Sequence, residues 1–91
     1  MLTSTADVTT ASAARYAKQL ASHLGHKAEV RDEEEGQRIV IGAGSCLLVP
    51  GDSLVLRAEA PDAEALERVQ WVVGSHLERF GARNELVVSW V

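Results

Sequence analysis

The sequence predicts an α+β fold, a two-layer sandwich in which two helices cover one face of a mainly antiparallel sheet. Residues 10–24 and 61–80 place apolar side chains at helical spacing. Residues 27–60 instead form short apolar runs that are separated by turn-forming residues. The predicted order of elements is β-α-β-β-β-β-α-β, and both helices most simply pack on the same face of the sheet.

The first strand and the first helix are predicted within residues 2–24. Residues 2–9 alternate apolar or small side chains with threonine and aspartate, which is typical of a half-buried strand. Thr9 or Thr10 is placed to cap the following helix, because its hydroxyl can accept a hydrogen bond from a free backbone amide. Gly25 is placed to end that helix in a left-handed cap. The predicted buried stripe consists of Ala13, Tyr16, Ala17, Leu20 and Leu24.

Four short strands are predicted to follow as a meander. Their segments are KAEVR, QRIVI, SCLLV and SLVLRAEA, and DEEEG, GAG and PGD mark the turns between them. One face of these strands is predicted to line the core, with Val30, Ile39, Ile41, Leu48, Leu54, Leu56 and Ala58. The opposite face would carry Val40, Leu47, Val49 and Val55, which makes it more apolar than a solvated sheet face usually is.

The helix of residues 61–80 is the longest periodic stretch of the chain. Its predicted buried stripe consists of Leu66, Val69, Val73, Leu77 and Phe80. Gly81 is placed to end it, and residues 84–91, NELVVSWV, alternate in the manner of a last strand. Val87 would then join the second face of the sheet.

Length and composition limit the classes of protein. Ninety-one residues, of which 46% are hydrophobic, predict one globular domain over residues 1–91. The formal charge of −4 opposes the counterion release that drives nucleic-acid binding, so no nucleic-acid partner is expected. No signal-peptide pattern or membrane-spanning run is present, and the single cysteine, Cys46, excludes an internal disulfide. A cytoplasmic protein without membrane attachment is therefore expected.

The side chains that suit a transition metal are His23, His26, Cys46 and His76. The sequence does not dictate that they converge. The simpler interpretation is a histidine at a helix end, a packed cysteine, and a histidine that is hydrogen-bonded at the edge of the core. No motif requires a cofactor.

No catalytic constellation is identified. Cys46 with a histidine base would be the minimum for thiol catalysis, but a cysteine that leads into the apolar run LLV is expected to pack as a small apolar group. The glycines of GAG at 42–44 lead into a strand and not into a helix, which favours a hairpin turn over a phosphate loop.

Two surfaces are candidates for contact with a partner. The second sheet face would make a homodimer interface, lined by Val40, Leu47, Val49, Val55 and Val87. Trp71 points away from the apolar stripe of its helix, so a partner could cover it, or its ring could lie over the stem of Arg68.

Five segments occur in a recognisable order and spacing: STADVTT, ARYAKQL, HLGHK, GSCLL, and HLERFGARNEL with a tryptophan shortly before the end. Over nearly the whole chain they resemble the small bacterial proteins classified as domain of unknown function 2218. The matching positions are Arg15, Tyr16, His23, His26, Lys27, Cys46, His76, Glu78, Arg79, Phe80, Arg83 and Trp90.

This resemblance implies no assigned activity, and relatives that occur beside siderophore genes imply an iron-linked or siderophore-linked role as an alternative. It places a polar ligand site at His26, Lys27, Cys46, His76 and Arg79. The chain departs from the family pattern at three positions, with Ala21 where relatives often carry a second cysteine, Asn84 where they carry an acidic residue, and Trp71 where a small or polar residue is usual. The missing cysteine weakens the idea of a two-thiol site.

The leading hypothesis is a non-enzymatic accessory domain that binds a small ligand or a protein partner and forms a homodimer. The alternatives are a metal-binding or iron-linked protein that uses histidine and cysteine ligands, and a thiol enzyme at Cys46.

Overall fold

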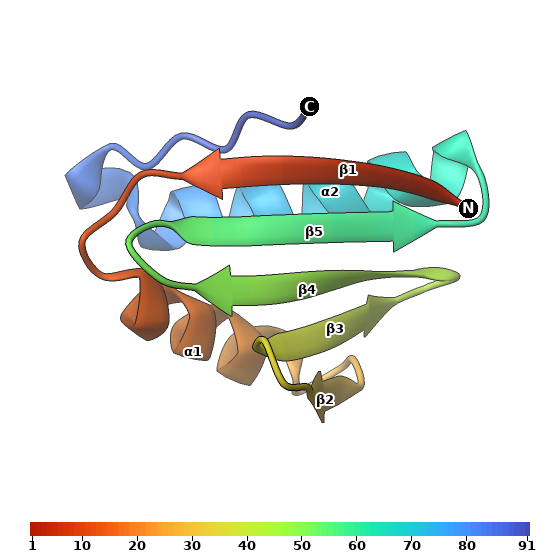
Figure 1. The fold of residues 1–91 in the computed structure, drawn as a ribbon, viewed down its shortest axis with the longest axis horizontal. Helices are drawn as coiled ribbons and strands as arrows, with labels where there is room; N and C mark the ends of the chain where they lie inside the picture. The colour runs from red at the N-terminus through yellow and green to blue at the C-terminus, as the bar shows by residue number, and fades with distance from the viewer.

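The computed structural model describes residues 1–91 and is built on a five-stranded antiparallel sheet in the order β1-β5-β4-β3-β2. The strands are β1 (Leu2–Val8), β2 (Val30–Asp32), β3 (Gln37–Ile41), β4 (Gly44–Pro50) and β5 (Leu54–Ala60). Helices α1 (Ala13–Leu24) and α2 (Ala63–Phe80) both lie behind the sheet in Figure 1. The predicted α+β fold class is confirmed.

The strands from β2 to β5 form the predicted meander, and β1 completes the sheet by pairing with β5. In the β3–β4 hairpin, Ile41 pairs with Gly44, so Gly42 and Ala43 form a two-residue turn. Gly42 has φ 58°, the left-handed value that the first residue of a type II′ turn requires. The hairpin expected at GAG is therefore present.

The core lies between the sheet and the two helices. The residues of β1, β3, β4 and β5 that face the helices are buried at every second position, except Leu2, Gln37 and Pro50 at strand ends. Leu20, Val69, Val73 and Leu77 complete the core from the helices. Of the predicted core strand residues, only Val30 is half-buried, since it lies in the short edge strand β2. No helix is long and apolar enough to span a membrane.

Asp62 caps the start of helix α2, since its carboxylate accepts a hydrogen bond of 2.8 Å from the amide of Ala65. At the start of α1, the Thr10 hydroxyl accepts from the amide of Ser12, one residue before the helix. The left-handed cap predicted at Gly25 is wrong, because Gly25 has φ −63°. The chain instead continues in helical turns, in which the amides of Gly25 and Lys27 bond to carbonyl oxygens of α1.

The predicted last strand is reduced to a single bridge between Ala6 and Trp90. A 3₁₀ turn at Ala82–Asn84 comes first, and the remaining residues pass back toward the outer edge of β1 in Figure 1, with only their end paired to it. Two backbone hydrogen bonds of 3.0 and 2.9 Å join Thr5 to Val91. The apolar side chains of this segment pack mainly on α2 and not on the second face of the sheet, and Val87 is exposed outside the sheet.

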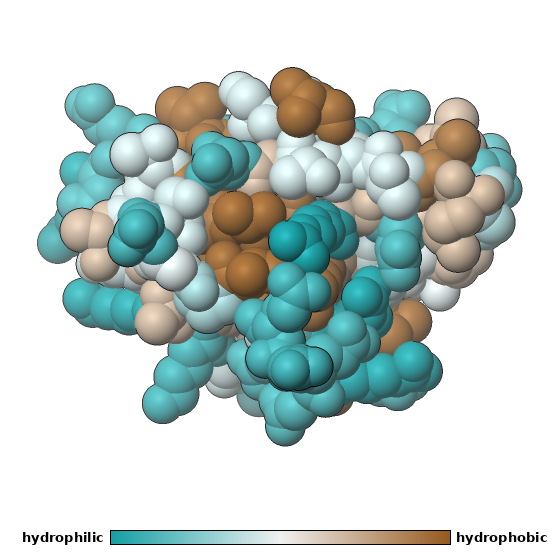
Figure 2. Space-filling model, in the orientation of Figure 1, coloured by the Kyte–Doolittle hydropathy of each residue, from teal (hydrophilic) through white to brown (hydrophobic).

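The face of the sheet that no helix covers is more polar than the alternation of valines suggested. Leu47 is only 4% exposed, and its cross-strand partners are Arg38 and Arg57. Arg38 donates to both carboxylate oxygens of Glu33, to Glu59 and to Ser45, while Arg57 donates to Glu35. Figure 2 accordingly shows a small apolar area in the middle of this face with residues of intermediate hydropathy and hydrophilic residues around it.

Val40, Val49 and Val55 are half-buried on the same face. Long arginine side chains can cover apolar neighbours with their stems while the charged heads stay in water, which explains how this face is partly shielded without a further layer.

Candidate functional site

The main cavity lies where the end of α1 and the following turn meet α2 and the β3–β4 hairpin, and its volume is about 680 Å³. It is lined by His23, Leu24, His26, Lys27, Ala28, Glu29, Val40, Ile41, Gly42, Arg68, Val72 and His76. Three separate parts of the chain therefore supply three histidines, two cations and an apolar wall.

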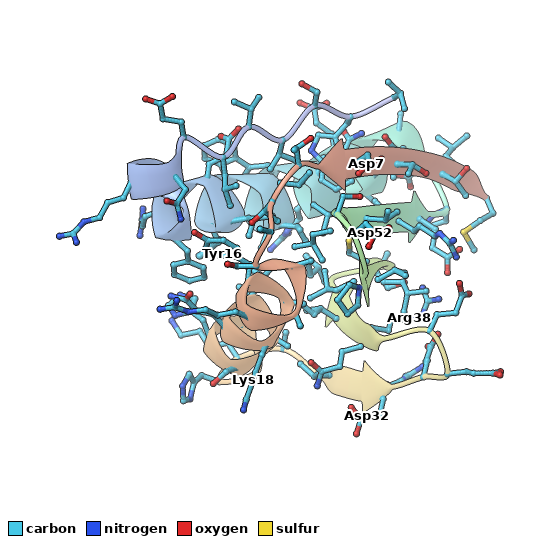
Figure 3. All side chains as sticks on the ribbon, turned by 60° about the vertical axis from the view of Figure 1, so that its left-hand side comes forward. Asp7, Tyr16, Lys18, Asp32, Arg38 and Asp52 are labelled. Atoms are coloured by element: carbon cyan, nitrogen blue, oxygen red, sulfur yellow. The ribbon has the colours of Figure 1, made fainter.

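The packing of α1 against α2 positions this cavity. Figure 3 shows Tyr16 on the side of α1 that faces α2, and Lys18 on the outer side. The Tyr16 hydroxyl accepts a hydrogen bond of 2.6 Å from the side-chain amide of Asn84, which ties α1 to the turn after α2. The last turn of α1 lies beside the C-terminal part of α2, where His23 packs against His76 and Phe80.

His23 and His76 meet at this junction, with their ring centroids 5.2 Å apart. The ring of His23 also packs edge-on against Phe80, at 5.2 Å. His76 Nδ1 lies 2.6 Å from the carbonyl oxygen of Val72, one helical turn earlier. Since a carbonyl oxygen can only accept, Nδ1 is the donor, and a neutral His76 ring keeps Nε2 as an acceptor.

The two cations of the cavity have no ion-pair partner. The four salt bridges of the chain involve Arg31, Arg38 and Arg57, and leave out Lys27 and Arg68. The single carboxylate among the lining residues, Glu29, is paired with Arg31, and this pairing lowers its pKa. The cavity therefore has positive charge that the protein itself does not neutralise.

Of the ligand site predicted from the sequence, His26, Lys27 and His76 line this cavity, and Cys46 and Arg79 do not. Cys46 is fully buried on the helix side of β4, and burial raises its pKa to about 12. Arg79 is exposed on α2, outside the cavity.

Of the expected metal ligands, the structure brings the three histidines to one cavity and keeps Cys46 in the core. No group of three or more histidine, cysteine, aspartate or glutamate side chains is arranged to hold a metal ion. The lining supplies imidazole nitrogens and two basic side chains, groups that can hydrogen-bond and ion-pair with an organic anion.

Arg68 and Val72 were not singled out from the sequence. With His76 they are spaced four residues apart along α2, which places all three on one flank of the helix. This four-residue spacing can be recognised in the sequence, and it identifies the three residues as neighbours on one flank of the helix. What the sequence did not provide was the position of His23, His26 and Lys27 opposite this flank.

Trp71 is 72% exposed on the outer side of α2, as its position relative to the apolar stripe predicted. It lines a second cavity of about 380 Å³ that also contains Trp90.

Comparisons with known proteins agree with this fold. A family model described as an uncharacterised protein conserved in bacteria, DUF2218, matches residues 5–91. The NMR structure of PA4090 from Pseudomonas aeruginosa is similar, with a TM-score of 0.81 and 36% sequence identity over 100% of this chain and 96% of that chain. No curated protein matches the sequence.

Proposed function

The chain belongs to the DUF2218 family of uncharacterised bacterial proteins, and from this premise we propose that it is a non-enzymatic domain that binds a small organic anion in the cavity between α1 and α2. One observation carries the proposal. Lys27 and Arg68 come from different elements, line the same cavity and have no ion-pair partner.

The size and lining of the cavity support a ligand with an apolar part. Its volume of about 680 Å³ lies within the range of small-molecule sites. Leu24, Ile41 and Val72 supply apolar wall, and six of the twelve lining residues carry a polar or charged side chain, contributed by the last turn of α1, the residues after it and α2. A carboxylate with a short aliphatic chain would satisfy both kinds of contact.

The electrostatics of the cavity support an anion. The lining holds two basic side chains, Lys27 and Arg68, and one carboxylate, Glu29, which is already paired with Arg31, so the local charge of the cavity is opposite in sign to the net charge of −4. An anion that bridges Lys27 and Arg68 would form charge-assisted hydrogen bonds, which are about twice as strong as neutral ones. The imidazoles of His23 and His26 add further donors whenever they are protonated.

The buried state of Cys46 argues against the thiol-enzyme alternative. A nucleophilic cysteine needs a lowered pKa and access to substrate, whereas this thiol is 0% exposed and has a pKa of about 12. Almost none of it is thiolate at neutral pH.

The anion site can be tested by NMR titration of isotope-labelled protein with sodium hexanoate. Hexanol is the control for the aliphatic chain alone, and hexylamine is the control of opposite charge. Hexanoate is expected to shift the amide signals of the cavity residues and to bind more tightly than either control. Equal shifts with hexanol, or none with hexanoate, would refute an anion site.

Matched variants make this test specific. Lys27→Met and Arg68→Gln are each expected to weaken hexanoate binding about tenfold, the effect of one lost hydrogen bond to a charged group. Lys18→Met and Arg79→Gln are the controls, because Lys18 lies on α1 and Arg79 on α2, both exposed and outside the cavity. They should leave the affinity unchanged.

A metal-linked role is the second candidate, because the rings of His23 and His76 lie 5.2 Å apart and His26 lines the same cavity. Elemental mass spectrometry of untagged protein after incubation with zinc and ferrous iron tests it, with a His26→Ala/His76→Ala double variant for comparison. Stoichiometric metal in the wild type that is lost in the variant would favour this candidate. Metal-free protein would eliminate it.

The homodimer also stays a prediction. The uncovered face offers Val40, Val49 and Val55, although the arginines over Leu47 reduce its apolar area. Sedimentation velocity at micromolar concentration tests it, and a Val55→Glu variant should dissociate any dimer that forms through this face.

A further inference from the structure

The second cavity lies on the outer side of α2, where the C-terminal segment passes the helix. It measures about 380 Å³ and is lined by Glu67, Gln70, Trp71, Gly74, Ser75, Glu78, Val88 and Trp90. We call these eight residues the tryptophan groove. It lies on a different flank of α2 from Arg68, Val72 and His76, so it is separate from the proposed anion site.

Helical spacing places one carboxylate on each side of the exposed indole of Trp71. Glu67 precedes Trp71 by one turn, and Glu78 follows it by two turns, so the three side chains share one face of α2. At 1.5 Å per residue, the acidic positions lie about 6 Å and about 10 Å along the axis from Trp71.

Gly74 and Trp90 form the floor of the groove. A Cβ added to Gly74 would lie 3.3 Å from Trp90 Nε1 and 3.6 Å from Val88 Cγ1, so the indole and the valine lie close against the helix backbone. Trp90 is half-buried by this contact, whereas Trp71 is 72% exposed. In the groove, the Trp90 ring is therefore packed against α2, whereas the Trp71 ring is exposed to solvent.

The charge of the groove is negative only. None of its eight residues is a lysine, arginine or histidine, and neither Glu67 nor Glu78 takes part in a salt bridge. Glu78 Oε2 accepts a hydrogen bond of 3.0 Å from the amide of Val88, which holds this carboxylate at the rim and leaves its other oxygen free.

We propose that the tryptophan groove docks a basic peptide segment of a partner protein, with an arginine or lysine side chain over the face of Trp71 and its charge between Glu67 and Glu78. Charge complementarity selects this occupant. A cation is attracted by the negative face of an indole, and two unpaired carboxylates add to that attraction. An acidic or purely apolar segment would leave both carboxylates facing no counter-charge.

The probe for this test is the blocked tripeptide acetyl-Arg-Leu-Arg amide, titrated into isotope-labelled protein at low salt. The controls are acetyl-Gln-Leu-Gln amide, which lacks charge, and acetyl-Glu-Leu-Glu amide, which reverses it. The arginine peptide is expected to shift the indole N–H signals of Trp71 and Trp90 and to bind several-fold more tightly than the neutral peptide. Added salt should weaken its binding.

The variants are chosen to leave the fold intact. Trp71→Ala and Glu67→Gln alter exposed positions, and each should weaken arginine-peptide binding about threefold to fivefold. Glu64→Gln is the matched control, because Glu64 is exposed on the same helix outside the groove. It should retain wild-type affinity.

Three outcomes would overturn the proposal. The first is the absence of shifts in the groove at millimolar arginine peptide, and the second is equal binding of the arginine and glutamine peptides. The third is self-association in sedimentation velocity that Trp71→Ala abolishes, because a second copy of the chain would then be the occupant.

Discussion

The Nδ1 atom of His76 lies 2.6 Å from the carbonyl oxygen of Val72, and this contact fixes the chemistry of the ring at the cavity. Nδ1 must carry a proton to donate to that carbonyl, so a neutral His76 keeps its lone pair on Nε2. The ring is thereby held against its own helix, while His23 packs beside it.

We therefore predict that neutral His76 populates the tautomer with its proton on Nδ1, which is the less common form in free histidine. Long-range nitrogen–proton correlation spectra of the imidazole report the tautomer directly. His26 lines the same cavity without a hydrogen bond of this kind and serves as the internal reference. A His76 signal dominated by the Nε2–H form would contradict the prediction.

Cys46 is predicted to make the free energy of unfolding depend on pH in the alkaline range. Burial raises the pKa of its thiol to about 12, above the ordinary value of 9.0 that the unfolded chain is expected to show. Between these values the unfolded state releases the proton and the folded state keeps it, so the free energy of unfolding should fall as pH rises above about 9. Urea unfolding at several pH values measures this slope.

Cys46→Ala is the control for that measurement, because tyrosine and lysine also titrate in this range. The alanine variant should lose part of the slope above pH 9, while labelling of the wild-type thiol by a disulfide reagent should require unfolding. A native protein that reacts as fast as free cysteine would contradict the buried position of this side chain.

Ser4 is predicted to be the hydroxyl with the largest effect on stability. It is 6% exposed, donates to the carbonyl oxygen of Val91 and accepts from the side-chain amide of Gln70, each at 2.9 Å. Ser4→Ala removes both bonds and should lower the free energy of unfolding by about 1–2 kcal/mol. Ser89→Ala, at an exposed position, should change it by less than about 0.5 kcal/mol in the same denaturant titration.

Arg38 is predicted to act on the uncovered sheet face through both its stem and its charge. Arg38→Met keeps most of the stem over Leu47, whereas Arg38→Ala exposes that leucine and should cost about 1 kcal/mol more in unfolding experiments. Equal stability of the two variants would show that the stem contributes nothing.

The electrostatic effect of Arg38 on Glu33 can be measured separately. Its hydrogen bonds hold the pKa of Glu33 below the ordinary value of 4.5, and the resulting contribution to stability is present above about pH 4.5 and lost as pH falls through the folded-state pKa. In Arg38→Met, an NMR pH titration should find the pKa of Glu33 raised toward its ordinary value. An unchanged pKa would mean that the pair does not form in solution.

The sequence predicted the two helices and the meander because long periodic stretches determine which side chains are buried. Leu66, Val73 and Phe80 recur at helical spacing, and the core strands alternate with period two. The register then follows from the turns, as the Gly42 hairpin illustrates.

The last strand was predicted from alternation alone, and alternation does not distinguish pairing with a strand from packing on a helix. Leu86, Val88 and Trp90 alternate in both cases. The left-handed residue Glu85 and the contact of Trp90 with Gly74 turn the segment along α2, and only the end of it reaches β1.

The candidate site was predicted only in part, because it depends on contacts between elements that lie far apart in the sequence. His26, Lys27 and His76 were named, but nothing local indicates that the end of α1 lies beside Arg68. For Cys46 the sequence offers both a ligand and a packed side chain, and the structure agrees with the second, because the alternation of β4 places this thiol in the core.

The paired backbone of Thr5 and Val91 has a consequence for behaviour at high concentration. An unprotected outer strand is a template on which another chain can add a strand and start an aggregate. The final residues occupy hydrogen-bonding positions along β1, and at the opposite edge β2 is only three residues long. Shortening the chain by these residues should therefore lower its solubility, which a concentration series of the full-length and shortened chains measures.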